Sequence, residues 1–168
     1  MKQNETTPEE SAPILEKRGP LKEQSDIAAD APLAVNAAVD GALDERMKSA
    51  LRAASDKKAV DSVVLDLRNV ANFTDYFLIT SGTNARQVQA IADEITERLK
   101  REGTRAERIE GYRNAEWVLV DYGDFIVHIF EEKARRFYDL ERLWRDATRV
   151  SIPGELRGEA NSSLRNES

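Results

Sequence analysis

The sequence contains no cysteine and a single histidine, His128. The absence of cysteine excludes disulfides, a thiolate nucleophile and zinc held by cysteine. A histidine without a second imidazole or a thiol offers no complete metal site, so we interpret His128 as a partly buried structural residue. We therefore predict no metal, no cofactor and no catalytic residue.

Long apolar runs are also missing. No segment approaches the roughly 20 apolar residues of a membrane-spanning helix, and the N-terminus has no apolar signal core. The acidity of the N-terminus argues against an Arg-rich organelle transit peptide. We expect a cytoplasmic protein without membrane contact.

Charge is unevenly distributed along the 168 residues. Residues 1–45 hold four Lys or Arg against ten Asp or Glu, a balance of −6 that equals the net charge of the chain. Residues 46–148 hold eighteen of each sign. A neutral domain lacks the field that drives sequence-independent binding to phosphate backbones. We therefore expect a protein partner and no direct sequence-specific nucleic acid binding.

Composition divides the chain into three parts. Residues 1–39 are rich in Glu, Ala, Pro and Ser without sustained periodicity, which predicts a disordered acidic N-terminal tail. Residues 149–168 have a similar composition and are predicted to form a disordered C-terminal tail. Residues 40–148 form the predicted domain. A short docking motif within the N-terminal tail is left open.

Hydrophobic periodicity in residues 40–148 indicates alternating helices and strands. The predicted helices cover residues 40–56 and 84–102, the second with Thr83 as N-cap and Gly103 as stop, and a helix or helix pair follows residue 130. The predicted strands cover residues 60–67, 76–81, 105–110, 117–121 and 125–130, and the last two form a hairpin. This order predicts an α/β fold with a mixed β-sheet and flanking helices.

Four aspartates are candidates for a nucleotidyl-transfer site: Asp66, Asp75, Asp121 and Asp124. Two-metal catalysis needs carboxylates that converge on two cations. Two aspartates at positions i and i+2 of a strand share a face and usually supply them. No such pair occurs in residues 40–148, and Asp side chains commonly cap turns like the one between Asp121 and Asp124. We predict no catalytic metal site.

The junction from Thr80 to Arg86 runs from a strand through Gly82 into a helix. Backbone N–H groups at such a helix start can bind an anion, and Arg86 would add a positive charge. Neither a Walker loop nor a three-glycine dinucleotide fingerprint is present. We interpret the junction as an ordinary capped helix start.

Large aromatic side chains interleave with acidic residues in the second half of the domain. Tyr and Trp beside charges are typical of protein interfaces. Phe137 and Trp144 are seven residues apart, which predicts one buried helix face. Trp117 and Tyr122 can either fill the core or be exposed to a partner.

Four motifs together resemble the ribosomal silencing factor family, also called the Iojap-like family. They are TDYFLITSGTNARQVQAIAD, the pair Glu110 and Gly111, WVLVDYGDFIVHIF and RRFYDLERLW. The resemblance implies a nucleotidyltransferase-like fold without the catalytic carboxylates. It also implies binding to protein fourteen of the large ribosomal subunit at the intersubunit face. Such binding would block association of the subunits and repress translation under nutrient limitation.

The resemblance further implies a homodimer in the free state and a link to large-subunit maturation. Two alternatives therefore stay open, a large-subunit assembly factor and an active nucleotidyltransferase. We predict a docking surface around Trp117, Asp121, Tyr122 and Asp124, with Glu110 and Glu116 at its rim. Further candidates are Asp75, Tyr76 and Arg86.

Overall fold

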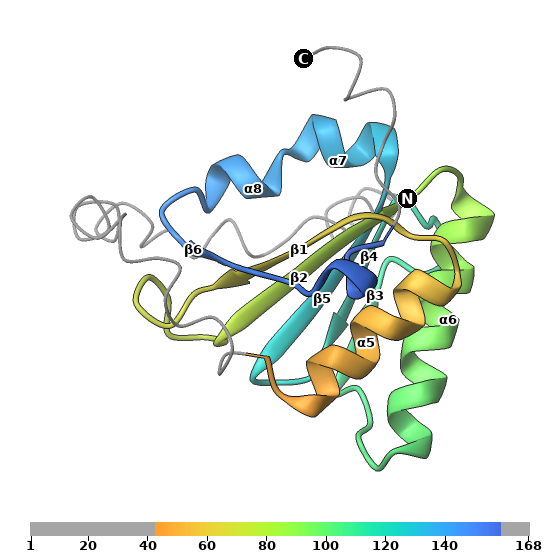
Figure 1. Cartoon of the computed structure of the whole chain (residues 1–168). Helices are drawn as coiled ribbons and strands as arrows, with labels where there is room; N and C mark the ends of the chain where they lie inside the picture. Colours follow the sequence, from red (N-terminus) through yellow and green to blue (C-terminus); the bar gives the residue numbers. More distant parts are fainter. Residues whose placement is uncertain (1–42, 159–168) are drawn as a thin grey trace, which may run out of the picture.

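The computed structural model describes residues 43–158 (Figure 1). In chain order the elements are α5 (Glu45–Asp56), β1 (Val60–Asp66), β2 (Tyr76–Gly82), α6 (Ala85–Arg101), β3 (Arg108–Glu110), β4 (Trp117–Asp121), β5 (Phe125–Glu131), α7 (Glu132–Tyr138), α8 (Leu140–Leu143), β6 (Thr148–Val150) and the 3-10 helix η1 (Gly154–Leu156). Within this span, no helix is both long and apolar enough to cross a membrane. The predicted N-terminal tail and the last ten residues lie outside the described residues.

The strands form one mixed sheet in the order β3-β4-β5-β2-β1-β6. β2 and β5 run parallel at its centre, and all other neighbouring strands pair antiparallel. Helices α5 and α6 cover one face, and α7 and α8 lie across the other (Figure 1). The predicted α/β fold with a mixed sheet and flanking helices is confirmed.

The first core layer lies between the sheet and the helices α5 and α6. The apolar stripes of both helices are buried: Met47, Ala50, Leu51 and Ala54 on α5, with Leu43 just before it, and Val88, Ile91, Ile95 and Leu99 on α6. The N-cap of α6 is Asn84, whose Oδ1 accepts from Gln87 N at 2.9 Å. The prediction of Thr83 as cap is wrong by one residue, because Gln87 Oε1 reaches back to accept from Thr83 N.

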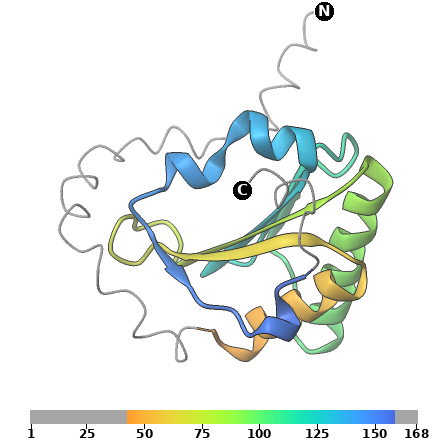
Figure 2. The ribbon, with the colours of Figure 1, turned by 45° about the horizontal axis from the view of Figure 1, so that its top comes forward.

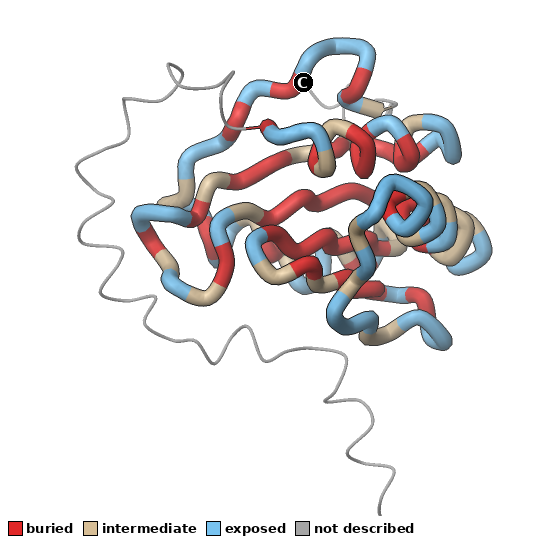
Figure 3. The backbone as a smooth tube through the Cα atoms, turned by 90° about the horizontal axis from the view of Figure 1, so that it is seen from below, coloured by how far each residue is buried: buried red, intermediate tan, exposed pale blue. Residues whose placement is uncertain are grey.

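The second core layer lies between the sheet and α7–α8, and it is rich in aromatic rings. Buried residues run along the strands, whereas exposed residues lie mainly on the outer sides of the helices and in loops (Figure 3). The buried aromatic side chains of this layer include Phe77, Trp117, Phe130 and Trp144.

The predicted burial is confirmed for Trp144 and wrong for Phe137, whose side chain is 79% exposed. Asp139 adopts a left-handed backbone conformation (φ 47°, ψ 53°) between α7 and α8. This break interrupts the helix, so the seven-residue spacing no longer keeps both side chains on one face. Leu140 and Trp144, four residues apart, are buried instead.

The prediction of disorder from residue 149 is wrong for residues 149–158. β6 pairs antiparallel with β1, placing Val150 opposite Val64. Ile152 and Leu156 are buried in the first core layer, and η1 lies beside α5 (Figure 2). The average composition of this segment is polar, but three apolar side chains at suitable positions are enough to fix it against the core.

Candidate functional site

Several predicted docking residues meet at the end of the sheet where the central strands β2 and β5 begin. The backbone N–H groups of Asp75 and Tyr76 donate to the carbonyl oxygen of Asp124 at 3.0 and 3.3 Å. Thr74 Oγ1 donates to the carbonyl oxygen of Gly123 at 3.0 Å. These bonds join the start of β2 to the β4–β5 turn, because parallel strands begin at the same edge. The turn-end surface is the name we give to Asp75, Tyr76, Asp121 and Asp124.

Two carboxylates of the turn-end surface are held by local contacts. Asp121 Oδ1 accepts from Gly123 N at 2.8 Å, as predicted for a turn cap, and its Oδ2 lies 3.2 Å from Arg108 Nη2. Asp124 pairs with Arg46 of α5 at 2.5 Å, and the two side chains remain 49% and 34% exposed, respectively. The surface therefore has mixed charge and a fixed backbone.

The aspartates considered for a two-metal site form other contacts. Asp66 pairs with Arg68 at 2.8 Å instead of facing another carboxylate. Among residues 43–158, no three His, Cys, Asp or Glu side chains are grouped so that they could hold a metal ion.

Trp117 is a core residue, so the prediction of an exposed docking anchor is wrong for it. Its side chain is 4% exposed and faces α7. The indole Nε1 donates to His128 Nδ1 at 3.0 Å, and the ring contacts Phe130 and Tyr138 at centroid distances of 4.9 and 4.8 Å. A partner could reach this ring only if α7 moved.

Tyr122 is likewise buried, at 5% exposure, and is unsuitable as an exposed anchor. The turn folds its ring onto Phe125, stacked at 4.9 Å, in the core layer under α5. The hydroxyl forms no hydrogen bond with the rest of residues 43–158. Burial raises the pKa of Tyr122 to about 12.

The structural interpretation of His128 is confirmed, although the ring is fully rather than partly buried. Because Nδ1 accepts from Trp117, the proton of the neutral ring lies on Nε2. Nε2 has no hydrogen-bond partner within the described residues. Burial lowers the pKa of His128 to about 3, so the ring is neutral near pH 7.

Of the remaining predicted docking residues, Glu110 lies beside the turn-end surface, whereas Glu116 and Arg86 lie away from it. Glu110 lies on edge strand β3, where Arg108 Nε is 3.3 Å from its carboxylate and links it to that surface. Glu116 lies at the opposite end of the hairpin, because its carbonyl oxygen accepts from Glu131 N at 3.0 Å. Arg86 is in the first turn of α6, after the far end of β2.

The junction into α6 is a capped helix start, as interpreted from the sequence. The Asn84 side chain caps the helix by accepting from Gln87 N, and Ser81 Oγ accepts a hydrogen bond from Arg135. No feature of this junction beyond the helix start itself points to an anion.

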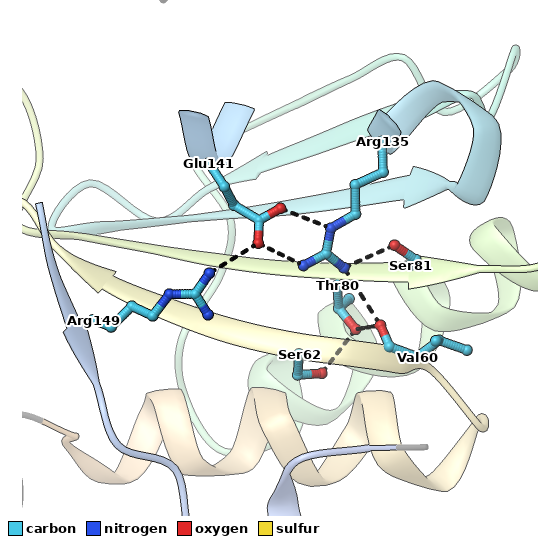
Figure 4. A network of polar contacts seen from close by, with 7 residues as sticks. All are labelled: Val60, Ser62, Thr80, Ser81, Arg135, Glu141 and Arg149. Carbon is cyan, nitrogen blue, oxygen red and sulfur yellow. Dashed lines mark hydrogen bonds and ion pairs between the residues drawn. The ribbon is translucent and has the colours of Figure 1, made fainter. Parts of the chain in front are cut away.

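Arg135 ties α7 and α8 to the sheet (Figure 4). Its Nε and Nη2 donate to the two carboxylate oxygens of Glu141 at 3.0 and 3.1 Å, and Nη1 donates to Ser81 Oγ at 2.8 Å. A cavity of about 450 Å³ lies beside it. Its charged lining is balanced, with four arginines (135, 136, 149 and 157) and four carboxylates (61, 132, 139 and 141). This balance gives no excess positive charge for a nucleotide phosphate.

Five large hydrophobic residues of the described part of the chain are exposed, and the sequence did not predict their exposure. These are Ile109, Tyr112, Phe137, Tyr138 and Leu143. Ile109 could have been found from its place in a short edge strand. The exposure of Phe137 depends on the break at Asp139, which the sequence does not signal.

The comparisons with known proteins align with this same domain. The family model described as "Ribosomal silencing factor during starvation" matches residues 41–168. The chain is 42% identical over 112 residues to Ribosomal silencing factor RsfS of Halalkalibacterium halodurans, covering 67% of this chain and 96% of that protein. It is 32% identical over 91 residues to the mouse protein named "Mitochondrial assembly of ribosomal large subunit protein 1", covering 52% and 40%. A crystal structure from Bacillus halodurans aligns with a TM-score of 0.58 and 40% identity, covering 64% of this chain and 98% of that chain.

Proposed function

Because the chain belongs to the ribosomal silencing factor family, we propose that it represses translation by blocking association of the ribosomal subunits. The family match over residues 41–168 is the observation that carries this proposal. We propose protein fourteen of the large subunit as its partner, at the intersubunit face, under nutrient limitation. The action takes place in the cytoplasm, and the free protein forms a homodimer.

The mechanism requires occupancy of a surface and no chemistry. A folded domain on the intersubunit face would clash with the approaching small subunit. The described residues contain no metal-binding group of side chains, and the only histidine is buried and neutral. Both observations favour a binding protein over an active nucleotidyltransferase.

We propose the turn-end surface as the docking site, with Glu110 at its rim. The carboxylates of Asp75 and Asp124 are exposed, and ribosomal proteins are generally basic. Complementary charge would speed encounter and fix the register of the complex. Tyr76 adds a partly buried ring beneath the Arg68 guanidinium at 5.2 Å. Glu116 and Arg86 lie at the other end of the strands, so we do not include them in this docking site.

Sedimentation with isolated ribosomal subunits tests the proposal. We expect the protein to migrate with free large subunits and to reduce the formation of joined ribosomes. Binding to small subunits only, or undiminished joining at saturating protein, would contradict it. Incubation with nucleoside triphosphates and Mg²⁺ should give no transfer product.

Charge reversal tests the placement of the docking site. Asp124→Lys should weaken binding to large subunits at least severalfold, because it places like charges opposite one another. The matched control is Glu97→Lys on α6, which is exposed and forms no ion pair within residues 43–158. Equal affinities of the two variants in sedimentation would show that the docking site is elsewhere.

Large-subunit assembly is the second candidate function. The observation that favours it is the printed name of the mouse relative, which refers to assembly of a large subunit. Depletion separates the two roles. Loss of an assembly factor should leave immature large subunits, whereas loss of a silencing factor should leave mature subunits that stay joined during starvation.

A further inference from the structure

The outer side of α7 and α8 carries exposed charge of a single sign. Between Glu132 and Arg149 every exposed charged residue is a cation, whereas all four carboxylates are only partly exposed. The cations Lys133, Arg136, Arg142 and Arg145 form no ion pair with any described residue. The zero net charge of residues 46–148 therefore hides a local separation of positive and negative charge.

Two exposed aromatic residues follow Arg136 directly in the sequence. Phe137 is 79% exposed and Tyr138 is 37% exposed, and their rings meet edge to face at 5.0 Å. The Tyr138 ring also packs on the buried Trp117 at 4.8 Å, which holds it in place. We call Lys133, Arg136, Phe137, Tyr138, Arg142 and Arg145 the basic–aromatic face.

The basic–aromatic face is held rigidly on the sheet. Arg135 binds Glu141 through two hydrogen bonds across the break at Asp139 and also binds Ser81 of β2 (Figure 4). Leu140 and Trp144 anchor the same segment in the core. The exposed side chains are therefore presented by a fixed backbone, which lowers the entropic cost of binding.

We propose that the basic–aromatic face binds a single-stranded RNA segment of the large subunit. Unpaired Lys and Arg side chains suit phosphates, and an exposed Phe beside arginines suits an unstacked base. The source of the RNA rests on the proposed function, but binding to bare RNA does not. The face lies on the α7–α8 side of the sheet, whereas the turn-end surface lies at the end of the sheet where β2 and β5 begin.

Fluorescence anisotropy with the full chain and a labelled unstructured RNA of about 15 nucleotides tests this inference. Four phosphate contacts predict a slope of log affinity against log salt of roughly −3. Arg136→Glu with Arg142→Glu should weaken binding at least about tenfold and roughly halve that slope. Phe137→Ala should weaken it about fivefold or more with little change in slope. The matched control is Arg52→Glu with Arg113→Glu, both exposed and outside this face, and it should bind like wild type.

The outcomes separate this inference from the proposed function. RNA binding that is lost in the α7–α8 variant and kept in the control supports the inference, even if no large subunit is bound. Equal RNA binding by the two double variants, with circular dichroism showing both folded, overturns it. Failure of the full chain to bind RNA, together with carbodiimide cross-links from Lys133 to residues 1–42, also overturns it, because the acidic N-terminal segment would then occupy the face.

Discussion

Single residues show why aromatic content is a poor guide to exposure in this chain. Trp117 and Tyr122 are adjacent to charged residues in the sequence, yet both are buried because each ring packs against a neighbouring element of the fold. Phe137 lies between charged and aromatic residues and is exposed. Neighbours in sequence therefore did not decide which rings reach the surface.

Trp117→Ala should destabilise the fold rather than remove a docking contact. The substitution leaves a cavity under α7 and removes the donor to His128, and we expect a loss of about 3–5 kcal/mol in the free energy of unfolding. Urea denaturation followed by circular dichroism measures it. Phe137→Ala, on the exposed side of α7, should change stability by no more than about 0.5 kcal/mol. Equal stability of the two variants would contradict the burial of Trp117.

His128 should make stability depend on pH. Burial lowers its pKa from 6.5 to about 3, so between these values the unfolded chain binds a proton that the folded chain does not. The stabilisation is complete above about pH 6.5 and falls by roughly 1.4 kcal/mol per pH unit as the pH decreases toward 3.

The variant His128→Gln removes this titration and keeps an acceptor for Trp117. We expect the unfolding free energy of the wild type to fall relative to that of the variant as the pH is lowered from about 7 to about 4. Carboxylates titrate in both proteins, so the difference isolates His128. Parallel stability curves over that range would contradict the prediction.

At the scale of elements, the start of α6 and the formation of β6 depend on specific contacts that cannot be predicted from composition. Asn84 rather than Thr83 caps α6. The Asn84 side chain accepts from the backbone N–H of Gln87, and the Gln87 side chain accepts from the backbone N–H of Thr83. β6 has only three residues, and its partner strand β1 lies more than eighty residues earlier in the chain. A strand this short is stable only when it is paired within a larger sheet.

Leu156→Ala should reveal how far η1 contributes to the domain. Leu156 is 6% exposed in the core layer beside α5, so its truncation should cost about 2–5 kcal/mol. Glu155→Ala in the same turn is the control, because its side chain is exposed. Thermal unfolding of both full-length variants measures the difference. A shift no larger than that of the control would show that this segment is dispensable for stability.

At the scale of the whole molecule, charge is separated between regions. The excess negative charge lies in residues 1–45, while the exposed charges of α7 and α8 are positive. The charges of residues 46–148 sum to zero, and this sum conceals the arrangement. Binding partners respond to local potential, which is screened over about 8–10 Å in physiological salt.

Removal of residues 1–39 should leave binding to large subunits at least as tight as that of the full chain. The acidic segment is repelled by ribosomal RNA, and the repulsion grows as salt is lowered. Sedimentation at several salt concentrations should therefore show the largest gain at low ionic strength. Weaker binding of the shortened chain would show that residues 1–39 carry a docking motif.

The sequence by itself determined the central elements, the mixed sheet and the absence of paired catalytic aspartates. Periodic apolar positions such as Val88, Ile91, Ile95 and Leu99 encode local structure, since side chains three and four apart share a helix face. Its family motifs also identified the family that the comparisons support. Local spacing carries this information without knowledge of the three-dimensional partners.

Only the tertiary structure decided which rings are exposed, that residues 148–150 join the sheet, and which aspartates meet. Asp75 and Asp124 come together because β2 and β5 start at one edge, and Phe137 is exposed because Asp139 breaks the helix. Exposure is a property of packing between distant segments. It therefore follows from the assembled layers and not from the neighbours of a residue in the chain.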